Sequence, residues 1–490
     1  MLDIIPLLLC LLPEMPMTTI RQFSRIALAL LAMTGRVTMR GISRWSGQGG
    51  SYRTVQRFFS TLLPWASVFW LFFRTHLYQR DDVYLLGGDE TVVTKAGKHT
   101  HGLDRFFASL YGKSVPGLAF FTLSLISTTQ RRSFPIHIEQ VLRSPQEKAA
   151  ARAKASATVA PATASKRKPG RPKGSTSKAK TAVELTSELC RIQTMLRALL
   201  TRIADLFPLT YLVLDGHFGN NNALVMAQQC QLQLISKLRS DAALYLPYDG
   251  PYAGRGPQRI YGDKLDVRAI PERYLRQMSV EERVETRIYQ LVARHKTFAQ
   301  PLNVVVIVKT NLKTQAVAHV ILFSSDLALA CDKLIDYYCL RFQLEFNFRD
   351  AKQYWGREDF MNISPTAVTN AANLSLFMVN LVERVLQDVR QRQGECSVLD
   401  LKAHCRGAKY VEETKNCCPK RQSRFYWSAF SARLLGLGVF IRYPLTPSHI
   451  IGEGIVNSLD IRNLNPPVTK NSRFTHVQQT THEQDRPQGW

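Results

Sequence analysis

Apolar residues recur every three or four positions near the start of the chain. They include Ile20, Phe23, Ile26, Ala27 and Leu30. This spacing gathers apolar side chains on one face of an α-helix, so it predicts buried amphipathic helices. We therefore expect an all-α N-terminal domain over residues 1–80, with DNA binding as its candidate function.

A possible helix-turn-helix lies within this domain. A first helix near residues 38–45 would be followed by a glycine-rich turn at 47–50, and Ser51 is a suitable cap for a second helix. Three polar residues of the second helix would share one face: Arg53, Gln56 and Arg57. They either contact DNA or form an ordinary solvated face, and the pattern favours neither.

From residue 83 the pattern changes to strands. Residues 83–88 and 118–126 are apolar, β-branched and aromatic runs, and the first leads directly into Asp89. They predict two adjacent core strands.

A strand, helix and strand follow later in the chain. After a helix over 183–206, the strand 209–214 ends at Asp215, a helix begins near Asn221, and a strand follows at 232–236. This order predicts an α/β core in which acidic residues stand at strand ends.

Residues 144–182 interrupt the core and are rich in Ala, Ser, Thr and Lys, so they predict a flexible basic linker. Within it, residues 166–174 resemble an AT-hook around Gly170, Arg171 and Pro172. An extended strand that carries arginine suits the narrow minor groove of A·T tracts. Pro169 stands where the motif usually has a basic residue, so a generic basic linker remains an alternative.

Short strands at 287–292, 302–309 and 317–323 predict a β-rich insertion domain over residues 241–325. The predicted catalytic core is then built from three segments, residues 81–143, 183–240 and 326–390. We expect a C-terminal helical region over 391–443 and a disordered polar tail over 444–490.

The charge of the chain narrows the choice of partner. The 490 residues carry 64 Lys plus Arg against 38 Asp plus Glu, a formal charge of +26. A basic chain of this size is typical of proteins that bind nucleic acid. The apolar stretch at residues 2–12 is too short to span a bilayer and has no basic leader, so we expect no membrane association and a cytoplasmic, nucleoid-associated bacterial protein. The nine cysteines show no paired spacing typical of zinc or redox sites.

The most specific pattern lies in residues 333–354, which contain no glycine or proline and predict a single helix. At about 100° per residue, four positions share one narrow face of that helix. They are Tyr338, Arg341, Glu345 and Lys352. Arg349 borders this face, while Leu340, Leu344 and Ala351 would pack on the core from the other side. The simpler alternative is a surface helix with an intrahelical ion pair between Arg341 and Glu345.

These residues resemble the transposases of the insertion sequence 4 family, whose signature is Tyr-(2)-Arg-(3)-Glu-(6)-Lys. The resemblance extends to Gly88-Asp89-Glu90-Thr91 and to Leu214-Asp215-Gly216-His217-Phe218, and it covers about residues 83–375. The order of the two aspartates, the long insertion and the glutamate is also similar to that of the family.

The resemblance implies an α/β fold with a ribonuclease H-like core and a β-rich insertion between the second aspartate and the glutamate. It implies that Asp89, Asp215 and Glu345 are catalytic and bind Mg²⁺, with Mn²⁺ as a substitute. Two such ions activate the attacking oxygen and stabilise the leaving one, and oxygen ligands suit them. Tyr338, Arg341 and Lys352 would grip phosphates at the transposon end.

Other acidic residues compete for these roles. Strand alternation turns Glu90 away from Asp89, and Asp350 lies off the polar face of the predicted helix, so we expect neither to be catalytic. His217 is close to Asp215 and is more often structural at such a place. The pair Glu358 and Asp359 are further rivals.

Several basic residues are candidate DNA contacts outside the signature. Lys237 and Arg239 end the strand after the second aspartate, where family members often carry basic residues. Arg349 and Arg171 complete the expected set. Four residues of the turn after Asp89 either contact phosphate or form a solvated hairpin: Lys95, Lys98, His99 and His101.

The function expected from the sequence is cut-and-paste transposition. The protein would cleave transposon ends and transfer the strands into target DNA, with double-stranded DNA as partner and a homodimer in the DNA complex. Two alternatives remain, a catalytically inactive DNA-binding protein derived from a transposase and a general nuclease on the same fold.

Overall fold

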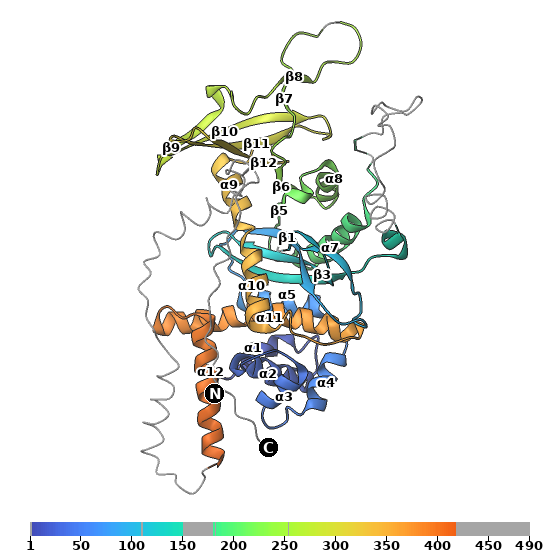
Figure 1. Cartoon of the computed structure of the whole chain (residues 1–490), viewed down its shortest axis with the longest axis vertical. Helices are drawn as coiled ribbons and strands as arrows, with labels where there is room; N and C mark the ends of the chain where they lie inside the picture. The colour runs from blue at the N-terminus through green and yellow to red at the C-terminus, as the bar shows by residue number, and fades with distance from the viewer. Residues whose placement is uncertain (1, 109–110, 150–179, 182, 253, 418–490) are drawn as a thin grey trace, which may run out of the picture.

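The computed structural model describes residues 2–108, 111–149, 180–181, 183–252 and 254–417. A mixed sheet runs through the middle and top of the molecule as oriented in Figure 1, and the helical N-terminal region lies below it. The strand order along the sheet is β2-β3-β1-β5-β6-β12-β11-β10-β7-β8, with β4 paired to β3 and β9 paired to β10. The predicted α/β class is therefore confirmed. Among the described residues, no helix is long and apolar enough to cross a membrane.

The N-terminal region is helical. Its helices are α1 (Ile5–Leu8), η1 (Leu9–Leu11), α2 (Met17–Ala32), α3 (Met39–Trp45), α4 (Tyr52–Ser60) and α5 (Trp65–His76). Ser51 caps α4 by accepting a hydrogen bond from the backbone N–H of Thr54. Aromatic rings join this region to the rest of the protein, because Phe23 packs against Phe377 at a centroid distance of 5.0 Å.

The first part of the sheet is antiparallel. Its strands are β1 (Tyr84–Thr94), β2 (Asp104–Ala108), β3 (Lys113–Ser127) and β4 (Arg132–Val141). β1 pairs with β3 without interruption from Tyr84 to Thr94. The sequence predicted that this strand ends just before Asp89, which is wrong, because the ladder with β3 carries the strand onward through that residue.

The second part is parallel and follows helix α7 (Ser187–Ile203). It contains β5 (Tyr211–Val213), η3 (Gly216–Phe218), α8 (Asn221–Gln229) and β6 (Gln233–Leu238). β5 pairs in parallel with β1 on one side and with β6 on the other. The buried residues of these two strands are mostly apolar, as expected for strands covered on both faces.

The predicted β-rich insertion forms six strands and a short helix. They are β7 (Leu244–Pro247), β8 (Tyr261–Lys264), η4 (Glu272–Tyr274), β9 (Leu275–Glu281), β10 (Val284–His295), β11 (Leu302–Asn311) and β12 (Val317–Ser324). β12 returns to the core and pairs antiparallel with β6, from Ile321 opposite Leu238 to Ser324 opposite Ile235. The sheet therefore continues from the core into the insertion.

The segment 333–354 forms two helices rather than the single predicted one. α9 spans Cys331–Leu340 and α10 spans Gln343–Trp355. Arg341 and Phe342 keep right-handed helical dihedral angles, but the backbone hydrogen bonds at the junction join residues three apart, as in Glu345 N–H to Phe342 C=O at 3.1 Å. Such tightening has no glycine or proline signal, which explains why the pattern missed it.

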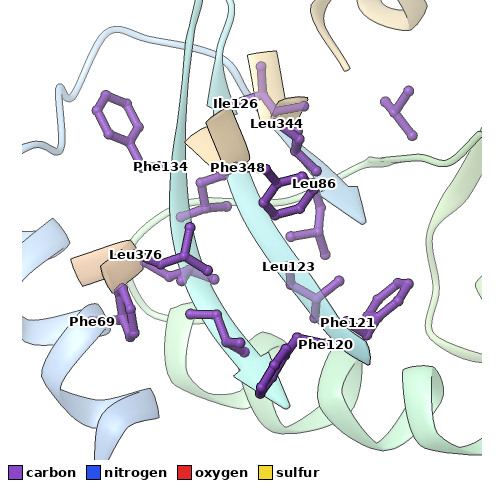
Figure 2. Packing of buried hydrophobic residues seen from close by; sticks show 14 of the residues in the cluster. Phe69, Leu86, Phe120, Phe121, Leu123, Ile126, Phe134, Leu344, Phe348 and Leu376 are labelled. Atoms are coloured by element: carbon purple, nitrogen blue, oxygen red, sulfur yellow. The ribbon is translucent and has the colours of Figure 1, made fainter. Parts of the chain in front are cut away.

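α10 lies close to β1 at Gly87, where the strand has no side chain. A Cβ atom at Gly87 would come within 2.7 Å of the Ile126 side chain and 2.9 Å of the Leu344 side chain, so a larger residue would force these side chains to shift. Leu344 is fully buried, which stabilises the contact by about 2 kcal/mol, and Figure 2 shows it beside Leu86 and Ile126. α10 ends at Gly356, whose φ of 71° is left-handed.

The chain continues in two longer helices, α11 (Pro365–Gln393) and α12 (Val398–Cys417). α11 packs on α10 and β4, and α12 packs on α2 of the N-terminal region. Several predictions lie outside the described residues, namely the AT-hook-like segment with Arg171 and the C-terminal chain after residue 417.

Candidate active site in a cleft beside β1 and β5

The pairing of β1 with β5 brings the two aspartates together. Gly87 pairs with Val213, and each aspartate lies two residues further along its strand. In a parallel pair this register places Asp89 and Asp215 side by side and on the same face of the sheet. Asp215 also caps η3, where its carboxylate accepts a hydrogen bond from the backbone N–H of His217.

α10 adds the third acidic residue to this face. Gly87 and Asp89 point to the same side of β1, and Leu344 packs on Gly87, so the start of α10 lies beside Asp89. Arg341 then links two of the acids. Its Nη1 is 3.1 Å from Asp89 Oδ2, and its Nη2 is 3.3 Å from Glu345 Oε1.

All three acidic residues line one cleft with a volume of about 940 Å³. The cleft is also lined by Arg341, Arg349 and Lys352. The structure therefore brings together six of the nine residues expected at the site from the sequence, although they come from separate segments of the chain.

Burial and mutual repulsion shape the electrostatics of the cleft. Burial raises the pKa of Asp89 to about 6, against the opposing effect of Arg341, and the neighbouring carboxylates of Asp215 and Glu345 raise it further. Burial also raises the pKa of Glu345 above its ordinary value. Because each carboxylate disfavours ionisation of the next, the group favours a cation between its members.

The residues fit a hard divalent cation in their chemistry, since carboxylate oxygens are the ligands that Mg²⁺ prefers. The positions of their side chains do not form a metal site in this structure. Within the described part of the chain, no three His, Cys, Asp or Glu side chains are grouped so that they could hold a metal ion. The cation between Asp89 and Glu345 in this structure is the guanidinium of Arg341.

The remaining signature residues differ in accessibility. Tyr338 is buried on α9, and burial raises the pKa of its hydroxyl to about 12. Lys352 Nζ forms an ion pair with Glu358 Oε1 at 3.0 Å. Arg349 is exposed and pairs with Asp350 at 3.1 Å. Arg239 does not line the cleft and forms an exposed ion pair with Asp241 at 2.9 Å.

The opposite wall of the cleft holds residues that the sequence analysis did not select. Glu90 lines the cleft together with Glu188 and Arg191 of α7. His217 Nε2 lies 3.5 Å from Glu188 Oε2, and this contact raises the pKa of the imidazole. Alternation does turn Glu90 away from Asp89, but the cleft extends to both sides of β1. Nothing in the local pattern of α7 signals this role.

The other candidates have structural contacts. Asp350 lies on a different face of α10 and does not line the cleft. Asp359 accepts a hydrogen bond from the backbone N–H of Val37 at 3.0 Å, which ties the N-terminal region to the core. Lys95 donates to the backbone carbonyls of Glu358 and Phe360 at 2.9 and 2.7 Å.

Comparison with solved structures finds a piggyBac transposase synaptic complex with hairpin DNA, determined by cryo-electron microscopy. The identity is 9%, the TM-score is 0.36, and the match covers 91% of this chain and 81% of that one. No curated protein matches the chain in sequence.

Comparison with protein families gives a match over more than half of the chain. The model of the DDE superfamily endonucleases matches residues 10–297. This range contains Asp89 and Asp215 and ends before the signature residues of α9 and α10, so it identifies the superfamily without reaching Glu345. The chain belongs to the DDE superfamily endonuclease family.

Proposed function

We propose that the protein is a DNA transposase of the cut-and-paste type, as the resemblance to the insertion sequence 4 family suggests. The observation that carries the proposal is the convergence of Asp89, Asp215 and Glu345 on one cleft. The cleft is large and open enough for a polymer backbone.

In this proposal the guanidinium of Arg341 moves away from between Asp89 and Glu345, and the three carboxylates then hold divalent metal ions, with Mg²⁺ as the expected ion and Mn²⁺ as a substitute. When bound, such ions would supply Lewis-acid activation of the attacking oxygen and charge neutralisation at the leaving oxygen of a phosphodiester. The raised pKa of Asp89 supports this role, because a neighbouring cation favours the ionised form of a crowded carboxylate.

The cations of the cleft would hold the DNA backbone. Arg341 lines the cleft, and its guanidinium lies between Asp89 and Glu345, so a phosphate bound beside these carboxylates would meet this cation. Arg349 and Lys352 lie further along the same side of α10 and would follow the strand. The formal charge of +26 supports binding to a polyanion.

Recognition of the terminal repeats must come from other residues, because phosphate contacts carry no sequence information. One candidate for recognition of the repeats is α4, the second helix of the predicted helix-turn-helix, because it carries exposed polar side chains. Arg53, Gln56 and Arg57 are exposed on it, whereas Val55, Phe58 and Phe59 are buried on the other side. The β-rich insertion is the second candidate, and a homodimer on DNA would bring two ends together.

The test uses the full chain and DNA that carries the inverted repeats flanking its gene. Glu345→Ala should lower the rate of nicking in Mg²⁺ by at least about 1,000-fold, because the reacting phosphate needs this carboxylate. The variant should still bind DNA as wild type does, because binding does not need it. Asp350→Asn is the matched control on the same helix and should nick normally. Nicking by the Glu345→Ala variant at the wild-type rate would contradict the proposal.

A general endonuclease is the second candidate, because the family match itself describes an endonuclease. The same assay separates the two functions. A transposase cuts at the repeat ends and yields strand-transfer products, whereas a general nuclease cuts unrelated DNA equally well and yields none.

A further inference from the structure

The cations that line the cleft at or next to α10 all face carboxylates of the same chain. The pairs are Arg341 with Asp89 and Glu345, Arg349 with Asp350, and Lys352 with Glu358. Two of these carboxylates belong to the proposed metal site, and Asp350 does not line the cleft. The remaining carboxylate is that of Glu358. It lines the cleft beside the lysine proposed to hold DNA, and the proposed function gives it no role.

The backbone around Glu358 is held by contacts with other parts of the chain. Nζ of Lys95 donates to the Glu358 carbonyl at 2.9 Å and to the Phe360 carbonyl at 2.7 Å. The next residue, Asp359, accepts a hydrogen bond at 3.0 Å from a backbone N–H of the N-terminal region. Because these contacts fix the backbone, the fold itself places Glu358 beside Lys352.

The side chains of this pair are less confined than the backbone. Nζ of Lys352 lies 3.0 Å from Oε1 of Glu358, and the two side chains are 33% and 46% exposed. Ion pairs that are this exposed to water are weak, because solvent screens the attraction and both side chains lose freedom when they pair. The carboxylate of Glu358 can therefore turn into solvent at little cost.

A DNA backbone in the cleft would bring a third charge to this pair. Lys352 would attract a phosphate, but Glu358 already lies at ion-pair distance from the same ammonium group. Two anions at one ammonium group are close enough to repel each other strongly. A phosphate that binds Lys352 would therefore drive the carboxylate of Glu358 away from it.

We propose that Glu358 is an intramolecular competitor of DNA for Lys352. Its carboxylate occupies the ammonium group that a backbone phosphate takes over, so DNA binding includes the loss of this ion pair. Glu358 thereby sets the affinity of the cleft for DNA below the value that Lys352 alone would give. This inference rests on the proposed function, because it takes DNA to be the ligand of the cleft.

The test is a double-mutant cycle on DNA affinity with the full chain. Anisotropy of a fluorescent duplex that carries the flanking inverted repeat measures affinity, without divalent metal so that no cleavage occurs. At about 0.15 M salt, charges more than about 8 Å apart are largely screened, so the measurement reports on close pairs. Glu358→Gln should raise affinity about 2- to 5-fold when Lys352 is present and less than about 1.5-fold in a Lys352→Met chain. Lys352→Gln serves as the second background if Lys352→Met does not fold.

Glu147→Gln is the matched control for the loss of one carboxylate from the cleft. Glu147 also lines the cleft, but it accepts a hydrogen bond from the Ser144 N–H at 2.7 Å instead of pairing with Lys352. Its replacement should change affinity by less than about 1.5-fold in either background. An equal rise from Glu358→Gln with and without Lys352 would overturn the proposal, because the carboxylate would then act only through its general charge.

A duplex of unrelated sequence tests whether a phosphate is the competing group. Glu358→Gln should raise its affinity by the same factor, because phosphate contacts carry no sequence information. A gain confined to the repeat duplex would contradict the proposal. Nicking of the repeat duplex by the wild-type chain in Mg²⁺ reports on the proposed function independently. Absence of nicking contradicts the transposase proposal, whereas an equal rise in both backgrounds contradicts only the role of Glu358.

Discussion

The two ends of α10 differ in how their charges are held. At the start of the helix, Arg341 and Asp89 form a largely buried ion pair in which the guanidinium is 14% exposed and the carboxylate 20%. Further along the helix, the pair of Arg349 with Asp350 has an arginine that is 60% exposed. The same types of residue therefore make a largely buried ion pair at one end and a solvated ion pair at the other.

The difference shows which charged side chains of an amphipathic helix can form a reactive site. Charges in water are screened and contribute little, while charges withdrawn from water respond strongly to each other and to a substrate. The start of α10 has this property because Leu344 packs against Gly87 of the neighbouring strand, which brings Arg341 to Asp89.

The largest effect on stability should come from removing the buried cation. Arg341→Met leaves Asp89 buried without its partner, so the free energy of unfolding should fall by about 2 to 3 kcal/mol and nicking by at least about 100-fold. Urea denaturation at pH 7.5 and a nicking assay measure the two effects. Arg349→Met is the control and should lower stability by less than about 0.5 kcal/mol. Equal stability losses in both variants would break the comparison.

A smaller effect should follow from neutralising the crowded carboxylate. The folded-state pKa of Asp89 is raised from 3.8 to about 6, so the folded protein binds this proton more tightly than the unfolded chain. Ionisation then destabilises the folded state as pH rises through about 4 to 6, and the cost is complete above that range. The difference in the free energy of unfolding between Asp89→Asn and wild type should therefore shift in favour of the variant by about 1 to 2 kcal/mol as the pH rises from 5 to 8.

Chemical denaturation at the two pH values measures this change, with Asp350→Asn as the baseline for loss of one carboxylate from the other side of the helix. If the difference in the free energy of unfolding between Asp89→Asn and wild type stays constant with pH, burial does not raise the pKa of this carboxylate. The same variant should be inactive in nicking.

The smallest effect concerns the exposed cations. Lys352→Ala should weaken DNA binding by about 3- to 10-fold and reduce the salt dependence of binding by about one charge, because Lys352 lines the cleft. Its stability should change by less than about 0.5 kcal/mol, since its ion pair with Glu358 is partly exposed. Fluorescence anisotropy across a salt series measures both affinity and slope.

Arg239→Ala provides the matched control, because Arg239 is exposed and does not line the cleft. Its effect on affinity should be about twofold or less. A loss as large as that of Lys352→Ala would place the DNA path across the end of β6 rather than along α10.

Much of the architecture was predictable because it depends on local periodicity. The helix that Ser51 caps, the strands of the insertion and the burial of Leu344 all follow from patterns of three, four or two residues. The errors arose where tertiary contacts decide. β1 continues past Asp89 because β3 pairs with it throughout, and the predicted single helix divides at Arg341 without any helix-breaking residue.

The candidate site shows the same division. Glu345 and its neighbours on α10 were selected from spacing, because a helix converts spacing into a shared face. Glu188 and Arg191 were missed, because nothing in the pattern of α7 shows that it borders the cleft beside Glu90.

The sequence alone determined which residues carry the charges and the helical spacing that arranges Glu345, Arg349 and Lys352 along one side of α10. The tertiary structure decided the rest. The parallel register of β1 and β5 placed Asp89 beside Asp215, and the contact of Leu344 with Gly87 brought Glu345 and Arg341 to them. The physical reason is that local spacing defines faces within one element, whereas the distance between elements depends on strand pairing and close packing across the whole chain.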